Sequence, residues 1–164
     1  MPRHAEGNHA HRAGALALAL ALAAVLAGCE KWQLDAQVRE LCARDGGMKI
    51  YETVALPADQ FDRWGMVKFY RPTGGEEALG QVYVFEHRTT YYRRGNPQVS
   101  RDHYRIVRRA DGMLLGETTL YGRSGGDLPG PWYDSGFSCP ENDVAGPNPL
   151  IRAVLVPESG GPLK

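Results

Sequence analysis

The sequence predicts an α+β domain in which an N-terminal helix packs on an antiparallel sheet of about four to five strands. Three observations support this fold class. An apolar stripe at helical spacing begins at Leu34, and three β-rich runs joined by short turns lie between Gln81 and Gly122. Residues 29–157 are also numerous enough to bury one hydrophobic core of their own.

The predicted helix lies at the start of this domain. Its apolar side chains recur at intervals of four, three and one residues, which places them on one face of an α-helix. Two consecutive glycines, at 46 and 47, end it. The residues of the apolar face are Leu34, Val38, Leu41 and Cys42. Cys42 is therefore expected on the buried side, near the end of the helix.

Three short elements are expected next. Met48–Val54 is rich in β-formers and predicts a strand. Residues 56–65 predict a short helix, because Pro57 suits a first helical turn and Gly65 suits its end. Met66–Tyr70 alternates weakly between apolar and polar residues and predicts another short strand.

The three β-rich runs cover residues 81–94, 100–109 and 113–122. Gly95-Asn96-Pro97 separates the first two, and Asp111-Gly112, a dipeptide suited to tight hairpins, separates the last two. Strands joined by such short turns are antiparallel, so the meander Gln81–Gly122 is the centre of the predicted sheet. A further run, Leu150–Val156, is expected to join the same sheet, and residues 158–164 are expected to form a disordered tail.

Between the meander and this last run lies a loop-like segment, Gly122–Pro149, that contains six glycines and five prolines. A loop of that length inside a compact domain is commonly functional. The segment predicts an ordered cover with a candidate partner-binding surface formed by Trp132, Tyr133 and Phe137. Alternatively, these aromatic side chains cap the apolar face of the sheet.

The N-terminus has the order of an export signal. Arg3 and Arg12 precede Ala15–Ala27, an apolar run of 13 residues that is short for a membrane span. Leu26-Ala27-Gly28-Cys29 then resembles the lipobox of bacterial lipoproteins. The resemblance implies a signal peptide at 1–28, a diacylglyceryl thioether on Cys29 and an acylated amino terminus, with palmitate as an expected fatty acid. The alternative is a plain signal peptide that has a cysteine nearby by accident.

The residue after this cysteine bears on location. In lipoprotein families an aspartate there tends to retain the protein at the inner membrane, whereas this chain has Glu30. The resemblance therefore implies an outer-membrane protein that is lipid-anchored and faces the periplasm. The membrane is its first expected partner, through the acylated Cys29.

The charge balance narrows the possible partners of the protein. The chain has 19 basic and 19 acidic side chains, of which 17 and 18 follow Gly28, so nucleic acid is not an expected partner.

Cys42 and Cys139 form an even pair, which in an oxidising compartment predicts a disulfide. The alternative is a reactive thiol with a histidine partner.

Arginines are concentrated between Arg88 and Arg109, in the first two runs of the meander, and Asp102 is the single acid in that stretch. Because the guanidinium group suits phosphate and carboxylate groups, these strands are a candidate anion-binding face for anionic lipid or an acidic envelope protein. Alternatively, the arginines pair with Glu52, Glu86 and Glu117 on a solvated face. The seven arginines are Arg88, Arg93, Arg94, Arg101, Arg105, Arg108 and Arg109.

Patterns that suggest catalysis are weak. Residues 122–126 match G-x-S-x-G around Ser124, but the glycines and prolines that follow cannot sustain the helix of a nucleophile elbow, and no histidine follows the serine. His87 and His103 lack further ligands at metal-binding spacing. No catalytic, metal or cofactor site is therefore predicted, and a small hydrolase using Ser124 or Cys42 is kept as an alternative.

Three segments resemble a family of small bacterial lipoproteins of uncharacterised activity. They are Glu40–Val54, Asp111–Asp127 and Phe137–Glu141, in the order and with the two cysteines that the family has. The resemblance implies one disulfide-linked domain and no mechanism. The expected function is a non-catalytic binding or envelope-maintenance module. Small, disulfide-stapled lysozyme-inhibitor lipoproteins are a second comparison, which makes inhibition of a cell-wall-degrading enzyme another alternative.

Overall fold

The computed structural model describes residues 30–127 and 133–158. Several predictions fall outside these residues and are not addressed by the fold. They are the signal peptide at 1–28, the lipidated Cys29, Trp132 of the partner loop and the tail beyond Glu158.

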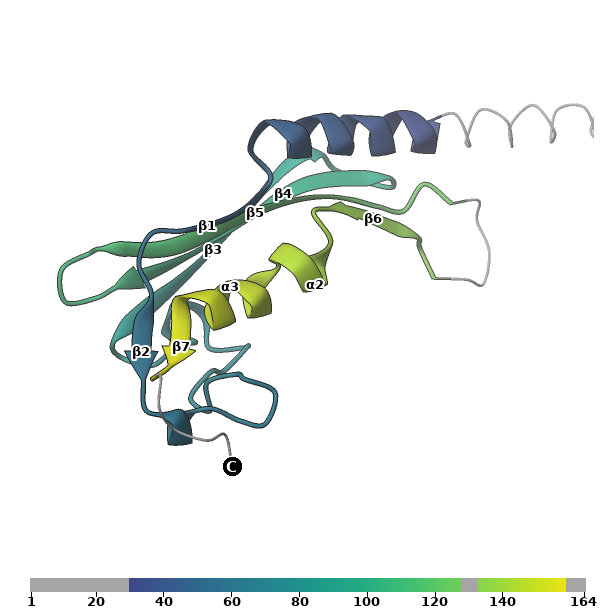
Figure 1. Ribbon diagram of the computed structural model, residues 1–164. Helices are drawn as coiled ribbons and strands as arrows, with labels where there is room; N and C mark the ends of the chain where they lie inside the picture. The colour runs from purple at the N-terminus through teal and green to yellow at the C-terminus, as the bar shows by residue number, and fades with distance from the viewer. Residues whose placement is uncertain (1–29, 128–132, 159–164) are drawn as a thin grey trace, which may run out of the picture.

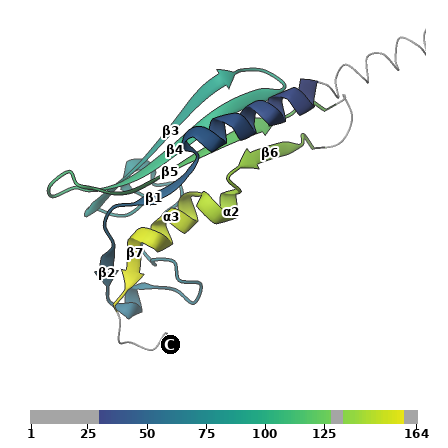
Figure 2. The same cartoon turned by 45° about the horizontal axis from the view of Figure 1, so that its top comes forward.

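The described residues form three layers (Figure 1). Helix α1, described over residues 30–45, lies on one face of a five-stranded sheet, and helices α2 (Asn142–Ala145) and α3 (Pro147–Val154) lie on the other face. A view turned by 45° shows the same separation (Figure 2). We call the two sides of the sheet the α1 face and the α3 face. The predicted α+β class, with its N-terminal helix on an antiparallel sheet, is confirmed.

The predicted meander forms the body of the sheet. Gly112, with a φ of 70°, and Gly95, with a φ of 99°, supply the backbone conformations that its two tight turns require. The edge of β5 that faces away from β4 is shared by two short strands, β1 beside residues 116–119 and β6 beside residues 121–124. The strands are β1 (Gly47–Ile50), β3 (Tyr83–Arg93), β4 (Gln98–Arg108), β5 (Leu114–Ser124) and β6 (Gly136–Cys139).

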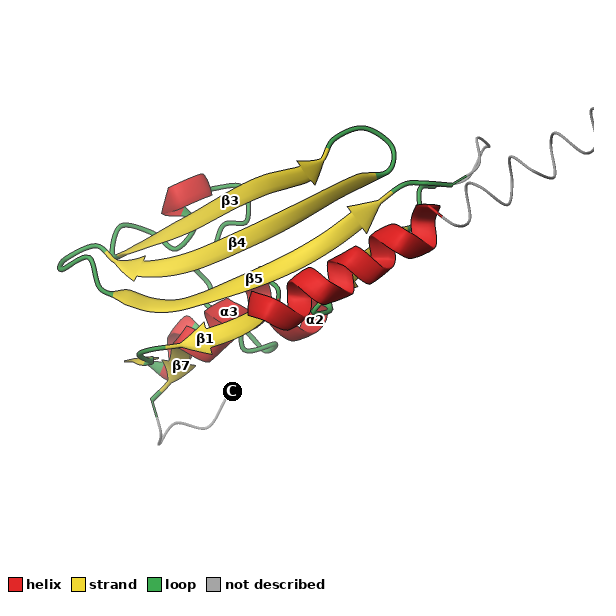
Figure 3. Cartoon of the chain, turned by 90° about the horizontal axis from the view of Figure 1, so that it is seen from above, coloured by secondary structure: helices red, strands yellow, loops and turns green. Residues whose placement is uncertain are grey.

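Each face of the sheet has its own hydrophobic cluster. On the α1 face, Leu34 and Val38 of α1 pack with Val99 of β4 and Tyr121 of β5. On the α3 face lies the larger core, built from side chains of α3, β3, β4 and β5 and from the segment between β2 and β3. Seen from above, α1 runs alongside β5 and leaves the α1 face of β3 and β4 uncovered by helix (Figure 3).

The C-terminal run is a helix followed by a short strand, so the prediction of a strand at Leu150–Val156 is wrong. Leu150 and Ile151 are adjacent and both fully buried, whereas neighbours in a strand point to opposite faces. Pro147 opens the helix, where a missing N–H costs nothing. The last residues form β7 (Leu155–Pro157), which pairs in parallel with β2 (Val54–Leu56) in a separate two-stranded sheet.

Truncating the buried face of α3 tests this assignment. Leu150→Ala is expected to lower the free energy of unfolding by about 2–5 kcal/mol, because it opens a cavity against β5. Arg152→Ala, on the exposed side of the same helix, is expected to change it by less than about 0.5 kcal/mol. Urea denaturation of both variants measures the difference, and equal losses would contradict a helix with one buried face.

Two short predicted elements between residues 48 and 70 are corrected. The strand predicted at 48–54 leaves the sheet after Ile50, where the N–H groups of Tyr51 and Glu52 both donate to the Leu115 carbonyl, at 2.9 and 3.0 Å. The strand predicted at 66–70 is reduced to one bridge, between Phe61 and Val67.

The helix predicted at 56–65 is a single 3-10 turn, η1 (Ala58–Gln60). The Asp62 carboxylate accepts the N–H groups of Trp64 and Met66, both at 2.9 Å, which replaces helical hydrogen bonds with a side-chain turn. A second 3-10 turn, η2 (Gly75–Glu77), precedes β3.

The segment Gly122–Pro149 is more regular than predicted. β5 continues to Ser124, β6 pairs with it as the fifth strand of the sheet, and α2 and α3 complete the segment. Phe137, predicted as part of a loop, lies on β6 and packs against the cluster under α1. The extended residues around Cys139 carried too little apolar periodicity to be recognised as a strand.

Candidate functional site

The link between the predicted anchor and the folded body is short. The described helix includes residue 30, which directly follows Cys29 in the chain. Among the described residues, no helix combines the length and apolarity needed to cross a membrane. Any lipid on Cys29 would therefore lie one residue from an element that packs on the sheet.

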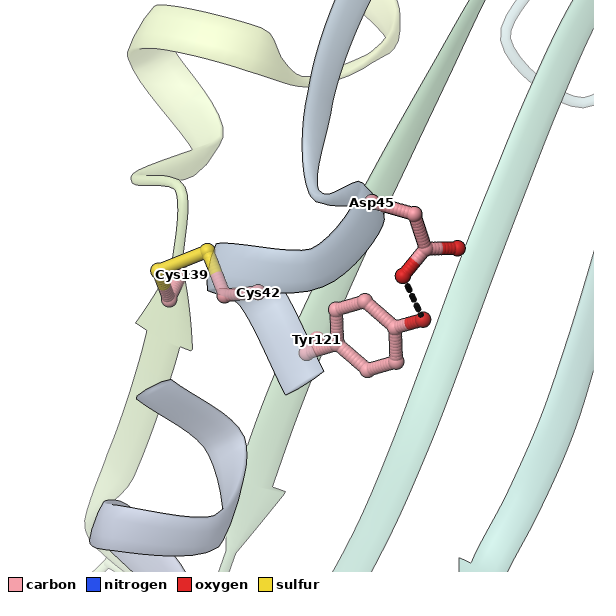
Figure 4. The surroundings of a disulfide bond; sticks show 4 residues. All are labelled: Cys42, Asp45, Tyr121 and Cys139. Carbon is pink, nitrogen blue, oxygen red and sulfur yellow. Dashed lines mark hydrogen bonds between the residues drawn. A yellow bond between two sulfur atoms is a disulfide. The ribbon is translucent and has the colours of Figure 1, made fainter. Parts of the chain in front are cut away.

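A disulfide joins Cys42 near the end of α1 to Cys139 at the end of β6 (Figure 4). This pairing is the one predicted, and it consumes both cysteines that follow Cys29. Beside it the Tyr121 hydroxyl donates to Asp45 at 2.7 Å, and both burial and this carboxylate raise the pKa of Tyr121. The C-terminal end of α1 is thus fixed covalently to one strand and by a hydrogen bond to another.

The seven predicted arginines do not form one face. Arg88, Arg101 and Arg105 lie on the α1 face, whereas Arg108 lies opposite Tyr83, whose ring belongs to the core of the α3 face. The other three lie at the two ends of the hairpin. Because side chains alternate along a strand, a run rich in arginine is divided between both sides of the sheet.

Most of these arginines have partners within the protein. Arg105 pairs with Glu86 at 2.8 Å, and Arg108 pairs with Glu52 at 2.6 Å and with Asp111 at 2.9 Å. Two of the three predicted glutamates are therefore used as expected, but Glu117 bonds instead to His103, at 2.9 Å. The remaining contacts are Arg93 to Glu30, Arg101 to Asp45, Arg109 to the Gln81 carbonyl and Arg94 over the Tyr91 ring.

One row of the α1 face alternates in charge across four strands. Glu86, Arg105, Glu117 and Lys49 are direct neighbours in the register of β3, β4, β5 and β1. Hydrogen bonds from Tyr51 and His103 lower the pKa of Glu117, which keeps this carboxylate ionised. The row neutralises itself, so it has little net charge to offer a large anionic partner.

The α3 face of β3 and β4 carries a cluster that the sequence did not reveal. The His87 ring stacks on Tyr104, with 4.2 Å between centroids, and its Nε2 lies 2.9 Å from the Asp102 carboxylate. Thr89 donates to the same carboxylate oxygen at 2.6 Å. Burial is the main cause that raises the pKa of Tyr104. The signal was the turn at residues 95–97, which places His87 opposite Tyr104 in an antiparallel hairpin.

This cluster does not have the order of a nucleophile, a base and an orienting acid. The Thr89 hydroxyl donates a hydrogen bond to Asp102. The His87 Nε2 atom lies near both the Thr89 hydroxyl and the same carboxylate oxygen. In an activated nucleophile the base accepts the hydroxyl proton and a third group orients the base. The arrangement positions polar groups beside aromatic rings, which suits binding.

The recess around these side chains is not one enclosed cavity. Its volume of about 980 Å³ is lined by His87 and Tyr104 from the α3 face and by Glu86 and Arg105 from the α1 face. Because β3 is an edge strand, the recess is open space on both of its sides. No group of three His, Cys, Asp or Glu side chains suited to a metal occurs in the described part of the chain.

Ser124 lies far from both histidines of the described residues. His103 lies opposite Thr119, five residues along β5, which corresponds to roughly 17 Å. His87 lies opposite Tyr104, which lies opposite Thr118, and is farther still. Ser124 is exposed and is followed directly by two glycines of positive φ, and the next described strand is β6. Cys42, the other candidate nucleophile, has no free thiol because it is in the disulfide.

Within the G-x-S-x-G segment, the arginine has a structural role. The Arg123 side chain is 2% exposed, and its guanidinium binds Asp35 of α1 at 2.5 Å and also the Gly125 and Ser135 carbonyls. Arg123 therefore connects β5 to α1 and to the residue that precedes β6. No local pattern in the sequence signals this role, because the partner lies 88 residues away.

The predicted partner loop is divided by the structure. Tyr133 is fully exposed, whereas Phe137 is half-buried on β6, where Arg39 lies over its ring at 5.0 Å. Trp132 lies outside the described residues.

No protein-family model, curated protein or solved structure matches this chain.

Proposed function

We propose that this protein is a lipid-anchored envelope lipoprotein, acylated on Cys29 and held at the periplasmic face of the outer membrane. The observation that carries the proposal is that two of the three cysteines form a disulfide and the third lies in the lipobox-like segment. Cys42 and Cys139 form the disulfide, while Cys29 stands alone in Leu26-Ala27-Gly28-Cys29. A disulfide that closes 97 residues also fits an exported protein, because such bonds persist in oxidising compartments.

The structure supports a close attachment. Helix α1 is described from residue 30, which directly follows Cys29, and it is held by the disulfide, by the Arg123–Asp35 pair and by the cluster around Leu34 and Val38. Two or more acyl chains anchor a protein stably, whereas one holds it only reversibly. The anchored body is therefore kept beside the membrane and does not extend from it on a linker.

We further propose that the folded body acts by binding and not by catalysis. Cys42 has no thiol to react, no described histidine reaches Ser124, and His87, Thr89 and Asp102 are not arranged to activate a nucleophile. The surface offers instead paired charges on the α1 face and aromatic rings with polar neighbours on the α3 face. These are features of a module that recognises an envelope component.

Metabolic labelling with an alkyne analogue of palmitate tests the anchor. The wild type is expected to incorporate the label, and Cys29→Ser is expected to lose it. The double variant Cys42→Ser/Cys139→Ser, which keeps only Cys29, is the matched control and is expected to retain it. Labelling of Cys29→Ser, or an unlabelled wild type, would contradict the proposal.

A further inference from the structure

Three segments that are far apart in the chain meet at the end of the domain next to residue 30. Glu30 pairs with Arg93, the last residue of β3 before the β3–β4 turn, at 2.7 Å, and Lys31 pairs with Asp127 at 2.6 Å. The Gly126 N–H donates to the Asn96 side chain at 2.6 Å, which joins the residues after β5 to the β3–β4 turn. The start of α1, the β3–β4 turn and residues 125–127 after β5 therefore meet at one end of the domain (Figures 1 and 3).

At this end of the domain, large aromatic side chains are exposed on α1, on β3 and before β6. The exposed fraction is 69% for Trp32 on α1 and 100% for Tyr133 before β6. Tyr91, near the end of β3, is exposed on the α3 face of the sheet and carries the Arg94 guanidinium over its ring at 4.4 Å. We call Trp32, Tyr91, Arg94 and Tyr133 the anchor-end surface.

The charges beside this surface are mostly paired. Arg93 is matched by Glu30, Lys31 by Asp127 and Arg123 by Asp35. The hydrogen bond from Lys31, with those from Ser135, lowers the pKa of Asp127 to about 2, so this carboxylate stays ionised. The surface thus combines exposed aromatic rings with little net charge. Trp and Tyr of this kind are enriched where membrane meets water.

The position of the anchor fixes the level of this surface relative to the bilayer. Trp32 is three residues after Cys29, a separation of about 4.5 Å in a helix and at most about 11 Å in an extended chain. The headgroup region on each side of a bilayer is roughly 5–7 Å deep. If Cys29 bears its lipid at the membrane surface, Trp32 lies within the headgroup layer or within a few ångströms of it.

We propose that the anchor-end surface docks into the phospholipid headgroup layer of the membrane that holds the acylated Cys29. This inference rests on the proposed acylation. Trp32, Tyr91 and Tyr133 enter the interface, and Arg94 reaches the phosphates. Because α1 runs alongside the strands, docking at this end directs β2 and β7 away from the membrane (Figure 1). The docking is carried by aromatic burial and depends little on salt.

Fluorescence quenching of single tryptophans tests the docking. The lipidated full chain is placed in phosphatidylethanolamine and phosphatidylglycerol vesicles containing lipid brominated near the headgroup. One protein keeps Trp32 (Trp64→Phe/Trp132→Phe), and its control keeps Trp64 (Trp32→Phe/Trp132→Phe). Trp64 is a matched reporter because it is 64% exposed and follows β2, at the opposite end of the domain.

Trp32 is expected to be quenched at least about twofold more than Trp64, and equally at low and high salt. Mass spectrometry of the same samples reports the lipid on Cys29. Equal quenching of the two tryptophans in lipidated protein would overturn the docking and leave the anchor intact. Quenching of Trp32 that disappears at high salt would overturn the aromatic mechanism. Absence of the lipid would overturn the proposed function itself, and the docking with it.

Discussion

Replacing Cys42 and Cys139 together with serine is expected to lower the free energy of unfolding by about 4–5 kcal/mol. The two residues are 97 positions apart, so the bond removes a large loop-closure entropy from the unfolded chain. The bond also joins α1 to β6, two elements outside the larger core. Without it, α1 is held by a small cluster and a few polar contacts.

Urea denaturation of the wild type and of Cys42→Ser/Cys139→Ser measures this effect. Ser138→Ala, an exposed change next to Cys139 on β6, is the control and is expected to change the free energy of unfolding by less than about 0.5 kcal/mol. A loss below about 1 kcal/mol in the double variant would show that α1 and β6 hold without the bond.

Asp35→Ala is the second change for which a large loss of stability is expected, about 3 kcal/mol. The Arg123 side chain is 2% exposed, and removal of its carboxylate partner leaves a buried guanidinium bound only to uncharged oxygens, those of the Gly125 carbonyl and of Ser135. The cost therefore comes mainly from the uncompensated charge.

Two further variants separate this explanation from a general weakness of α1. Glu40→Ala removes an exposed carboxylate that pairs with Arg44 on the same helix, and it is expected to cost less than about 0.5 kcal/mol. Asp35→Leu/Arg123→Met removes both charges of the pair and is expected to be more stable than Asp35→Ala. If Asp35→Leu/Arg123→Met loses as much stability as Asp35→Leu and Arg123→Met lose in sum when made singly, the pair is not coupled.

The sequence was sufficient for the elements whose local signals agreed. The meander was predicted because glycine-containing turns and β-rich runs gave consistent information, and α1 because its apolar stripe had helical spacing. Leu150–Val156 was wrongly predicted as a strand because its β-branched residues outweighed the helix start at Pro147. Its position is decided by the core, where Leu150, Ile151 and Val154 all meet the α3 face, and that tertiary preference is not local.

The candidate site was less predictable than the fold. Arginine-rich strands were expected to form one face, but alternation divided the arginines between two sides and gave most of them acidic partners. The His87–Asp102 contact and the Arg123–Asp35 pair depend on register and on a packed helix. A single sequence shows residue types, whereas these contacts arise from distances that only the folded chain defines.

One thiol, that of Cys29, is proposed to carry the lipid that keeps this body at a membrane. The most direct measurement is the mass of the N-terminal peptide from protein purified out of envelopes. We expect a peptide that begins at Cys29 and carries a diacylglyceryl group and an amide-linked fatty acid. An unmodified peptide that begins at Cys29 or at any other residue would contradict this proposal.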